Sequence, residues 1–140
     1  MIRKFNETDI DTVMFIWLNS NLEAHNFIDP DYWKGCFDSV KMMISRTEVY
    51  VSEICGAVNG FIGITDNYID GLFVDKSARE EGIGSELLNY VKKDRSKLYL
   101  DVYKKNILAV KFYKNHGFKI VEEKSDFQTS ETDYIMSWER

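Results

Sequence analysis

Hydrophobic residues along this chain follow two periods, one typical of helices and one typical of strands. Between residues 8 and 44, and again between 82 and 115, apolar positions recur every three or four residues, which predicts helices. From residue 48 the period changes to two, which predicts strands. The expected helices cover 8–19 or slightly beyond, 30–44, 82–94 and 106–115. The expected strands cover 2–5, 48–54, 58–64, 68–74, 97–103, 118–124 and 134–138.

Local signals mark where these helices begin and end. Thr8 and Asp9 supply N-cap groups for the first helix, whose end we expect at Asn19-Ser20-Asn21 or slightly later. Asp29-Pro30-Asp31 is expected to start the second helix, since proline is tolerated in a first helical turn. Gly117 follows the last helix as a C-terminal breaker. Two helices therefore come first, followed by a hairpin and then alternating strands and helices.

This order of elements predicts one α/β (α+β) domain that spans residues 1–140. We expect a mixed, mostly antiparallel sheet of about six to seven strands with helices on both faces. A length of 140 residues suits one ordinary domain, and an apolar content of 44% excludes a disordered chain.

The charge balance argues against a nucleic-acid partner. The chain has 18 basic and 23 acidic residues and a net charge of −5, whereas DNA binders rely on neutralising phosphates. Cys36 and Cys55 are too few for a disulfide framework, and no apolar run suits a membrane span or a signal peptide. His25 and His116 lack partners at metal-ligand spacing. We therefore expect a cytoplasmic protein with no metal and no membrane partner, while the sequence leaves monomer and homodimer open.

A glycine-containing turn between an apolar strand and a helix is the most informative stretch. Here Gly82 and Gly84 remove side chains from the amides that open the helix. Those N–H groups have no partner inside the helix and carry partial positive charge, so a phosphate or pyrophosphate fits there. A Walker loop would need Gly-Lys-Ser/Thr, which Ile83-Gly84-Ser85 does not supply, and a dinucleotide fingerprint would need glycine at Leu87.

Two motifs follow one another from this turn onward. Arg79, Gly82 and Gly84 have the spacing R-x-x-G-x-G, and residues 106–118 read N-x-x-A-x-x-F-Y-x-x-x-G-F. In composition, order and separation, these motifs resemble the acyl-CoA loop and the following segment of the GNAT (Gcn5-related N-acetyltransferase) superfamily. The resemblance covers nearly the whole chain. Residues 25–28 and 32–33 also look like small bacterial protein or peptide lysine acetyltransferases.

The resemblance implies that acetyl-CoA is the co-substrate. Backbone groups of residues 72–74 would align its pantetheine arm, and amides of residues 80–85 would hold its pyrophosphate. Glu80 and Glu81 place two carboxylates beside that dianion, with Arg79 and Lys76 as the nearest compensating cations. Asn106 would contact the pantetheine, or only cap its helix. The implied cofactor-binding residues are Leu72, Phe73, Val74, Arg79, Glu80, Glu81, Gly82, Ile83, Gly84, Ser85 and Asn106.

The resemblance also implies that Tyr113 protonates the leaving thiolate, a transfer that the reference pKa values of phenol and thiol permit. Packing beside Phe112 is the alternative role. The general base stays open: Asp101 stands where several relatives carry a base glutamate, Asp70 is its rival, and water without a side-chain base is the third possibility. Neither cysteine falls in a matched motif position, so we expect direct attack in a ternary complex.

The acceptor is expected to enter between the amino-terminal helices and the last hairpin. His25, Phe27, Tyr32 and Trp33 would form its aromatic wall, with core packing as the alternative for Phe27 and Trp33. Carboxylates near the closing hairpin would suit a cationic amine: Asp126, Glu131 and Asp133. The acceptor is expected to be a protein or peptide lysine or an N-terminal amine. A small-amine or antibiotic acetyltransferase and a non-catalytic acyl-CoA-binding module are the alternatives.

Overall fold

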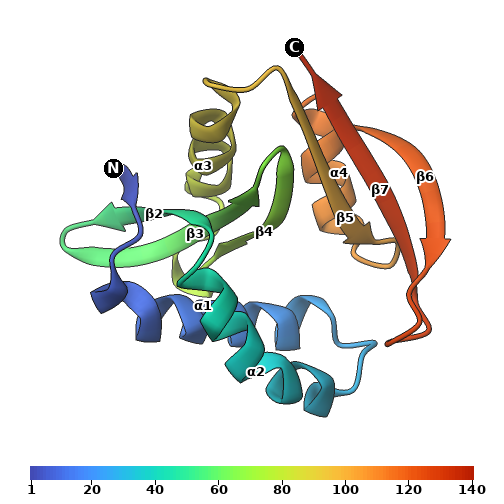
Figure 1. Cartoon of the computed structure of the whole chain (residues 1–140), viewed down its shortest axis with the longest axis horizontal. Helices are drawn as coiled ribbons and strands as arrows, with labels where there is room; N and C mark the ends of the chain where they lie inside the picture. Colours follow the sequence, from blue (N-terminus) through green and yellow to red (C-terminus); the bar gives the residue numbers. More distant parts are fainter.

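A computed structural model describes residues 1–140, which form a seven-stranded sheet with helices on both faces (Figure 1). The α-helices are α1 (Ile10–Ala24), α2 (Pro30–Ile44), α3 (Ile83–Lys92) and α4 (Ile107–Asn115), and short 3-10 turns cover Glu7–Asp9 and Lys76–Ala78. The strands are β1 (Ile2–Lys4), β2 (Glu48–Ile54), β3 (Ala57–Thr65), β4 (Tyr68–Val74), β5 (Lys97–Tyr103), β6 (Lys119–Ser125) and β7 (Thr132–Glu139). The predicted fold class is confirmed.

The sheet divides into two halves that meet only at one end of β4 and β5. The strand order is β1-β2-β3-β4-β5-β7-β6, and every neighbouring pair is antiparallel except β4 and β5. That parallel contact consists of two residue pairs, Tyr68 with Tyr99 and Ile69 with Leu100. Beyond them the two strands diverge (Figure 1), so the facing backbone edges of both strands lack a strand partner.

Each face of the sheet has its own hydrophobic core. α1 and α2 cover one face, where Val13, Met14 and Trp17 pack with Val49 and Phe61 among others. α3 and α4 lie on the other face, where side chains such as Leu87, Leu88, Leu98, Leu100 and Met136 are almost completely buried. The alternating pattern of the strands therefore supplies both cores, because successive side chains point to opposite faces.

The helix boundaries agree with the predicted signals except at the start of α1. Asn6 caps the 3-10 turn that leads into this helix, because its side chain accepts from the Thr8 N–H, and Asp9 makes no capping bond to α1 but accepts from the Asn6 N–H.

The end of α1 lies slightly later than Asn19-Ser20-Asn21, as the prediction allowed, and the helix continues to Ala24. The reason is that the Asn19 and Asn21 side-chain amides donate to the carbonyls of Phe15 and Trp17, each at 2.8 Å. Bonding one turn back satisfies these polar groups inside the helix rather than ending it. None of the helices has both the length and the apolar content needed to cross a membrane.

Candidate active site

The divergence of β4 from β5 opens a groove of about 300 Å³ beside the free edge of β4. Its floor comes from the three β4 residues that the sequence predicted for the pantetheine arm, and α1, α3 and α4 supply the walls. A register shift in β3–β4 leaves Asp70 as an extra residue, a bulge just before this edge. The groove residues are Ser20, Ala24, His25, Leu72, Phe73, Val74, Arg79, Gly84, Asn106, Leu108, Ala109, Phe112 and Tyr113.

The first turn of α3 presents backbone amides at one end of this groove. Gly82 caps the helix with φ +80°, a left-handed conformation that glycine adopts without strain. The first backbone bond of the helix runs from the Glu86 N–H to the Gly82 carbonyl at 3.0 Å, so the preceding N–H groups have no helical partner. A Cβ on Gly84 would lie 3.4 Å from Cζ of Phe112, an ordinary contact distance, so a side chain longer than that of alanine would extend into the groove.

The other residues predicted for the pyrophosphate loop occupy different places. Ile83 is buried in the core, and the Ser85 hydroxyl lies 2.9 Å from Nε2 of His116. Glu80 and Glu81 are exposed and do not line the groove, and Glu80 adopts a left-handed φ of +68°. Their carboxylates are therefore turned toward solvent, where screening limits repulsion of an anion.

Arg79 is the cation of the groove, and it pairs with Glu23 at the end of α1. Its guanidinium contacts the Glu23 carboxylate, and its Nε donates to the Val74 carbonyl at 3.4 Å. Lys76 reaches the same carboxylate at 4.0 Å. Both predicted cations therefore gather around one acidic side chain from the opposite wall of the groove.

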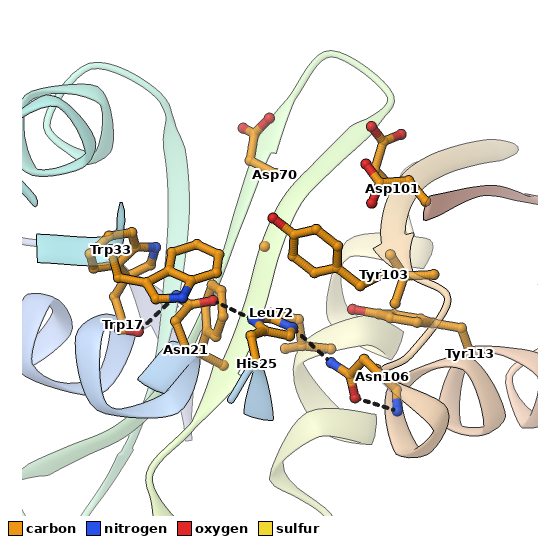
Figure 2. Close-up of a pocket in the computed structure, with 15 residues that line it drawn as sticks. Trp17, Asn21, His25, Trp33, Asp70, Leu72, Asp101, Tyr103, Asn106 and Tyr113 are labelled. Carbon is orange, nitrogen blue, oxygen red and sulfur yellow. Dashed lines mark hydrogen bonds between the residues drawn. The ribbon is translucent and has the colours of Figure 1, made fainter. Parts of the chain in front are cut away.

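A second cavity of about 270 Å³ continues from the groove toward the closing hairpin (Figure 2). The two spaces share His25, Leu72, Phe73, Asn106, Ala109 and Tyr113. The second cavity is also lined by Trp17, Asn21, Trp33, Asp70, Gly71, Asp101, Val102, Tyr103 and Asp133. The groove lies beside unpaired helix amides, whereas the second cavity is lined by aromatic and acidic side chains. The two spaces meet at Tyr113.

Tyr113 lies on α4, and its ring extends into the cavity (Figure 2). The side chain is 8% exposed and packs edge-on against Phe112 and Phe118. Burial raises the pKa of the Tyr113 phenol above its ordinary value, so the hydroxyl keeps its proton at neutral pH. Tyr113 therefore packs in the core and also reaches the place where the two cavities meet.

Three carboxylates line the second cavity, and two of them have partners. Asp101 accepts a hydrogen bond from the Tyr68 hydroxyl and forms an ion pair with the Lys124 ammonium at 2.9 Å. Asp70 accepts from the Thr65 hydroxyl at 2.6 Å. The alternation predicted for β5 is confirmed, because Leu98, Leu100 and Val102 are buried and Asp101 is exposed on the other face. Both candidate bases therefore reach the cavity already hydrogen-bonded.

The third carboxylate, Asp133 on β7, differs from the other two. It is 8% exposed, and its Oδ1 has no hydrogen-bond partner. Burial, followed by the charges of Asp126 and Asp101, raises the pKa of Asp133 to about 6. The sequence placed this residue among the acids near the hairpin, but its burial depends on pairing with Tyr103 across the β5–β7 ladder.

Aromatic side chains gather around Tyr103, a residue that sequence reasoning did not assign to the site. Its ring centroid lies 4.8 Å from that of His25, 5.7 Å from Phe27 and 6.3 Å from Trp33. His25 and Trp33 line the cavity, whereas Phe27 packs behind them and Tyr32 lies 4.9 Å from Trp33. Tyr32 also donates to Gln128 at 2.9 Å, joining α2 to the hairpin loop. The signal for Tyr103 was its position two residues after Asp101, on the same strand face.

A row of hydrogen bonds joins α1 to α4 across the cavity (Figure 2). The Asn21 amide donates to the Trp17 carbonyl, so its oxygen accepts from Nδ1 of His25 at 2.9 Å. Nε2 of His25 then accepts from the Asn106 amide at 3.0 Å, and the Asn106 oxygen accepts from the Ala109 N–H at 3.3 Å. This row fixes His25 as the neutral Nδ1–H tautomer, and burial lowers its pKa to about 4. The predicted cap by Asn106 is confirmed.

His25 should make the stability of the fold depend on pH. Its pKa is about 4 when folded and about 6.5 in an unfolded chain. The unfolded chain therefore binds a proton that the folded chain excludes, and stability present above pH 6.5 is lost toward pH 4, by up to about 3 kcal/mol. The raised pKa of Asp133 acts in the opposite direction. Chemical unfolding of wild type and His25→Gln isolates the effect, since Asp133 is common to both: their difference in unfolding free energy should shrink on acidification. A constant difference would contradict the neutral assignment.

The comparisons with known proteins agree with this geometry. An acetyltransferase (GNAT) domain matches residues 19–132, so the chain belongs to the GNAT family of N-acetyltransferases, whose co-substrate is acetyl-CoA. Among its relatives, peptidyl-lysine N-acetyltransferase YiaC of Escherichia coli (strain K12) is 33% identical over 140 residues, covering 99% of this chain and 96% of that protein.

Solved structures show the same fold. The solution structure of apo YjaB from Escherichia coli matches with a TM-score of 0.87 and 23% identity, covering 99% of this chain and 96% of that one. PaiA N-acetyltransferase from Thermoplasma acidophilum, solved in complex with coenzyme A, matches with a TM-score of 0.82 and 21% identity, covering 100% and 98%. The predicted family, enzyme class and family co-substrate are confirmed.

Proposed function

We propose that this enzyme transfers the acetyl group of acetyl-CoA to a lysine side chain of a protein or peptide, by direct attack in a ternary complex. The observation that carries the proposal is the meeting of two distinct cavities at Tyr113. A thioester in one cavity and an amine in the other need no covalent relay through the protein. Neither cysteine lines either cavity, which supports direct attack.

The residues of the groove fit acetyl-CoA as a substrate. The free edge of Leu72–Val74 offers backbone groups to the amides of the pantetheine arm, as an added strand would. The amides of Ile83, Gly84 and Ser85, with Arg79 beside them, suit the pyrophosphate. When bound, acetyl-CoA supplies the activated acyl carbon. A backbone N–H of this β4 edge would stabilise the negative charge that develops on the carbonyl oxygen.

Tyr113 is proposed to donate a proton to the departing sulfur. A buried phenol with a raised pKa is a weak acid in isolation. The same dry surroundings raise the pKa of a thiol that leaves there, because burial disfavours each anion. The pKa values of the phenol and of the leaving thiol therefore stay closer to each other than the raised phenol pKa alone implies.

The acceptor side favours a lysine. Its aromatic walls, formed by Trp33 and Tyr103 with His25, suit the aliphatic stem of the side chain, and its carboxylates suit the ammonium. YiaC, the relative 33% identical to this chain, is named a peptidyl-lysine N-acetyltransferase, which supports the same class of acceptor.

Cys36 and Cys55 are both unpaired, the form that a reducing compartment maintains, which supports action in the cytoplasm.

Glu23→Gln should strengthen coenzyme A binding. The substitution removes one negative charge from the groove and releases Arg79 for the pyrophosphate. Because the pair is exposed, the gain should be roughly 2- to 5-fold and should fade at high salt. Calorimetric titration with coenzyme A measures it, with Glu7→Gln as a control at the opposite end of the first helix. Weaker binding by Glu23→Gln would show instead that this carboxylate organises the site.

Acceptor screening tests the proposed function. Purified enzyme and acetyl-CoA are incubated with lysine peptides, with peptides whose only amine is at the N-terminus, with polyamines and with aminoglycosides. We expect acetylated lysine, detected by mass spectrometry, together with release of free thiol. Exclusive acetylation of N-termini or small amines would replace the proposed acceptor. Coenzyme A binding without transfer to any amine would favour a non-catalytic module.

A further inference from the structure

Two buried polar atoms in residues that line the acceptor cavity have no hydrogen-bond partner. One is Oδ1 of Asp133 and the other is Nε1 of Trp33, in residues 8% and 7% exposed. A buried polar atom without a partner is costly, and native proteins rarely keep one unless a ligand or water satisfies it. An unpaired carboxylate oxygen requires a hydrogen-bond donor, and an unpaired indole N–H requires an acceptor.

A lysine residue within a peptide supplies both groups. Its ammonium can donate to Asp133, and a main-chain carbonyl can accept from Trp33, whereas a simple alkylamine supplies only the donor. The cavity is thus polarised between an acidic end on β7 and an aromatic wall on α2.

We propose that Asp133 binds the acceptor ammonium and is the general base of the reaction. This role rests on the proposed function, lysine acetylation. Both oxygens of Asp101 have partners, Tyr68 and Lys124, and one oxygen of the exposed Asp70 accepts from Thr65. Asp133 is the one of the three carboxylates whose unpaired oxygen is buried. Asp101 instead adds negative charge to the acceptor side, as a positioning residue.

The charges around Asp133 come from several elements. Asp101 lies on β5, Lys124 faces Asp133 across the β6–β7 pair, and Asp126 and Glu131 lie in the β6–β7 connection. The carboxylates raise the pKa of Asp133, Lys124 lowers it, and burial has the largest effect. The same burial lowers the pKa of a bound ammonium. The pKa values of the ammonium and of the carboxyl therefore lie closer together than their values of about 10.4 and 3.9 in water.

Asp133 and Tyr113 share the proton transfers of the reaction. The carboxylate of Asp133 takes one proton from the ammonium, and the freed nitrogen lone pair forms a bond to the acyl carbon. As the carbon–sulfur bond breaks, the sulfur takes the Tyr113 hydroxyl proton. The nitrogen then releases a second proton as the amide forms, which restores Tyr113, and Asp133 returns its proton to solvent. One proton is released overall, with no oxidant or reductant.

Asp133→Asn tests this role, because it keeps the shape and removes the basicity. Its kcat/KM for a lysine peptide should fall at least roughly 100-fold, while acetyl-CoA affinity by calorimetry stays unchanged. The wild-type acid limb near pH 6 should disappear. A peptide carrying aminoethylcysteine, a less basic amine, should be impaired less by the substitution than lysine. The melting temperature of the variant should be equal to or higher than that of the wild type at neutral pH, since a buried charge is removed.

Asp126→Asn is the matched control. Asp126 does not line the cavity, and asparagine retains the oxygen that accepts from the Gln128 N–H at 2.9 Å. It should move the acid limb to lower pH, because the pKa of Asp133 falls, and should leave coenzyme A affinity unchanged. Near-wild-type turnover with an unchanged pH profile in Asp133→Asn would overturn this role and leave lysine acetylation standing. A wild-type enzyme inactive on every lysine peptide would overturn both.

Discussion

Replacing Tyr113 by phenylalanine is expected to reduce kcat about 100-fold, the usual contribution of a positioned general acid. The substitution removes one hydroxyl and retains the ring that packs against Phe112 and Phe118. The leaving sulfur would then depart as an unprotonated thiolate into a dry cavity, where an anion is poorly stabilised. Steady-state kinetics should place the loss in kcat, with little change in coenzyme A affinity by calorimetry.

Tyr90→Phe provides the matched control for Tyr113. Tyr90 also lies on a helix and packs against the core, but it lines neither cavity, so removal of its hydroxyl should leave turnover unchanged. Equal turnover in wild type and Tyr113→Phe would remove Tyr113 from the chemistry and leave it a packing residue.

Gly84→Trp is expected to reduce coenzyme A affinity at least roughly 100-fold, which corresponds to about 2.7 kcal/mol of binding free energy. A Cβ at this position would already lie 3.4 Å from Phe112 and 3.8 Å from Val74. An indole added there must therefore extend into the groove beside β4 and cover the amides of the α3 turn. Calorimetric titration with coenzyme A measures the loss, and melting curves establish that the variant is folded.

Two controls separate blocked binding from general damage. Gly84→Ala meets Phe112 at ordinary contact distance and should retain most of the affinity. Gly35→Trp introduces the same indole on α2, where nothing lies within 4 Å of the added Cβ, and should bind coenzyme A like wild type. Undiminished affinity in Gly84→Trp would mean that the groove is not the cofactor site.

The periodic elements and the glycine turn were predictable because their signals are local. Apolar spacing locates the four helices, Asp29 and Asn106 cap two of them with their own side chains, and Gly82 lies at the start of α3, where the motif placed it. The end of α1 was less predictable, because Asn21 bonds at once to its own helix and to His25, and that second contact requires tertiary structure.

The acceptor side was predictable only in part for a similar reason. Residues 25–33 were assigned to it from their composition, but the ring around which they gather, Tyr103, lies about 70 positions away on β5. The burial and unpaired oxygen of Asp133 depend on how β5, β6 and β7 pair, which alternation along one strand does not determine. Sequence therefore identified acidic residues near the hairpin, and packing distinguished one of them.

The most direct measurement is the structure of the enzyme with coenzyme A bound, at a resolution that shows hydrogen-bonding distances. The pyrophosphate should contact the amides of Ile83, Gly84 and Ser85, the pantetheine should pair with the edge of Leu72–Val74, and the sulfur should lie within reach of the Tyr113 hydroxyl. A cofactor seated away from the divergence of β4 and β5, or a sulfur remote from Tyr113, would contradict the proposed active site.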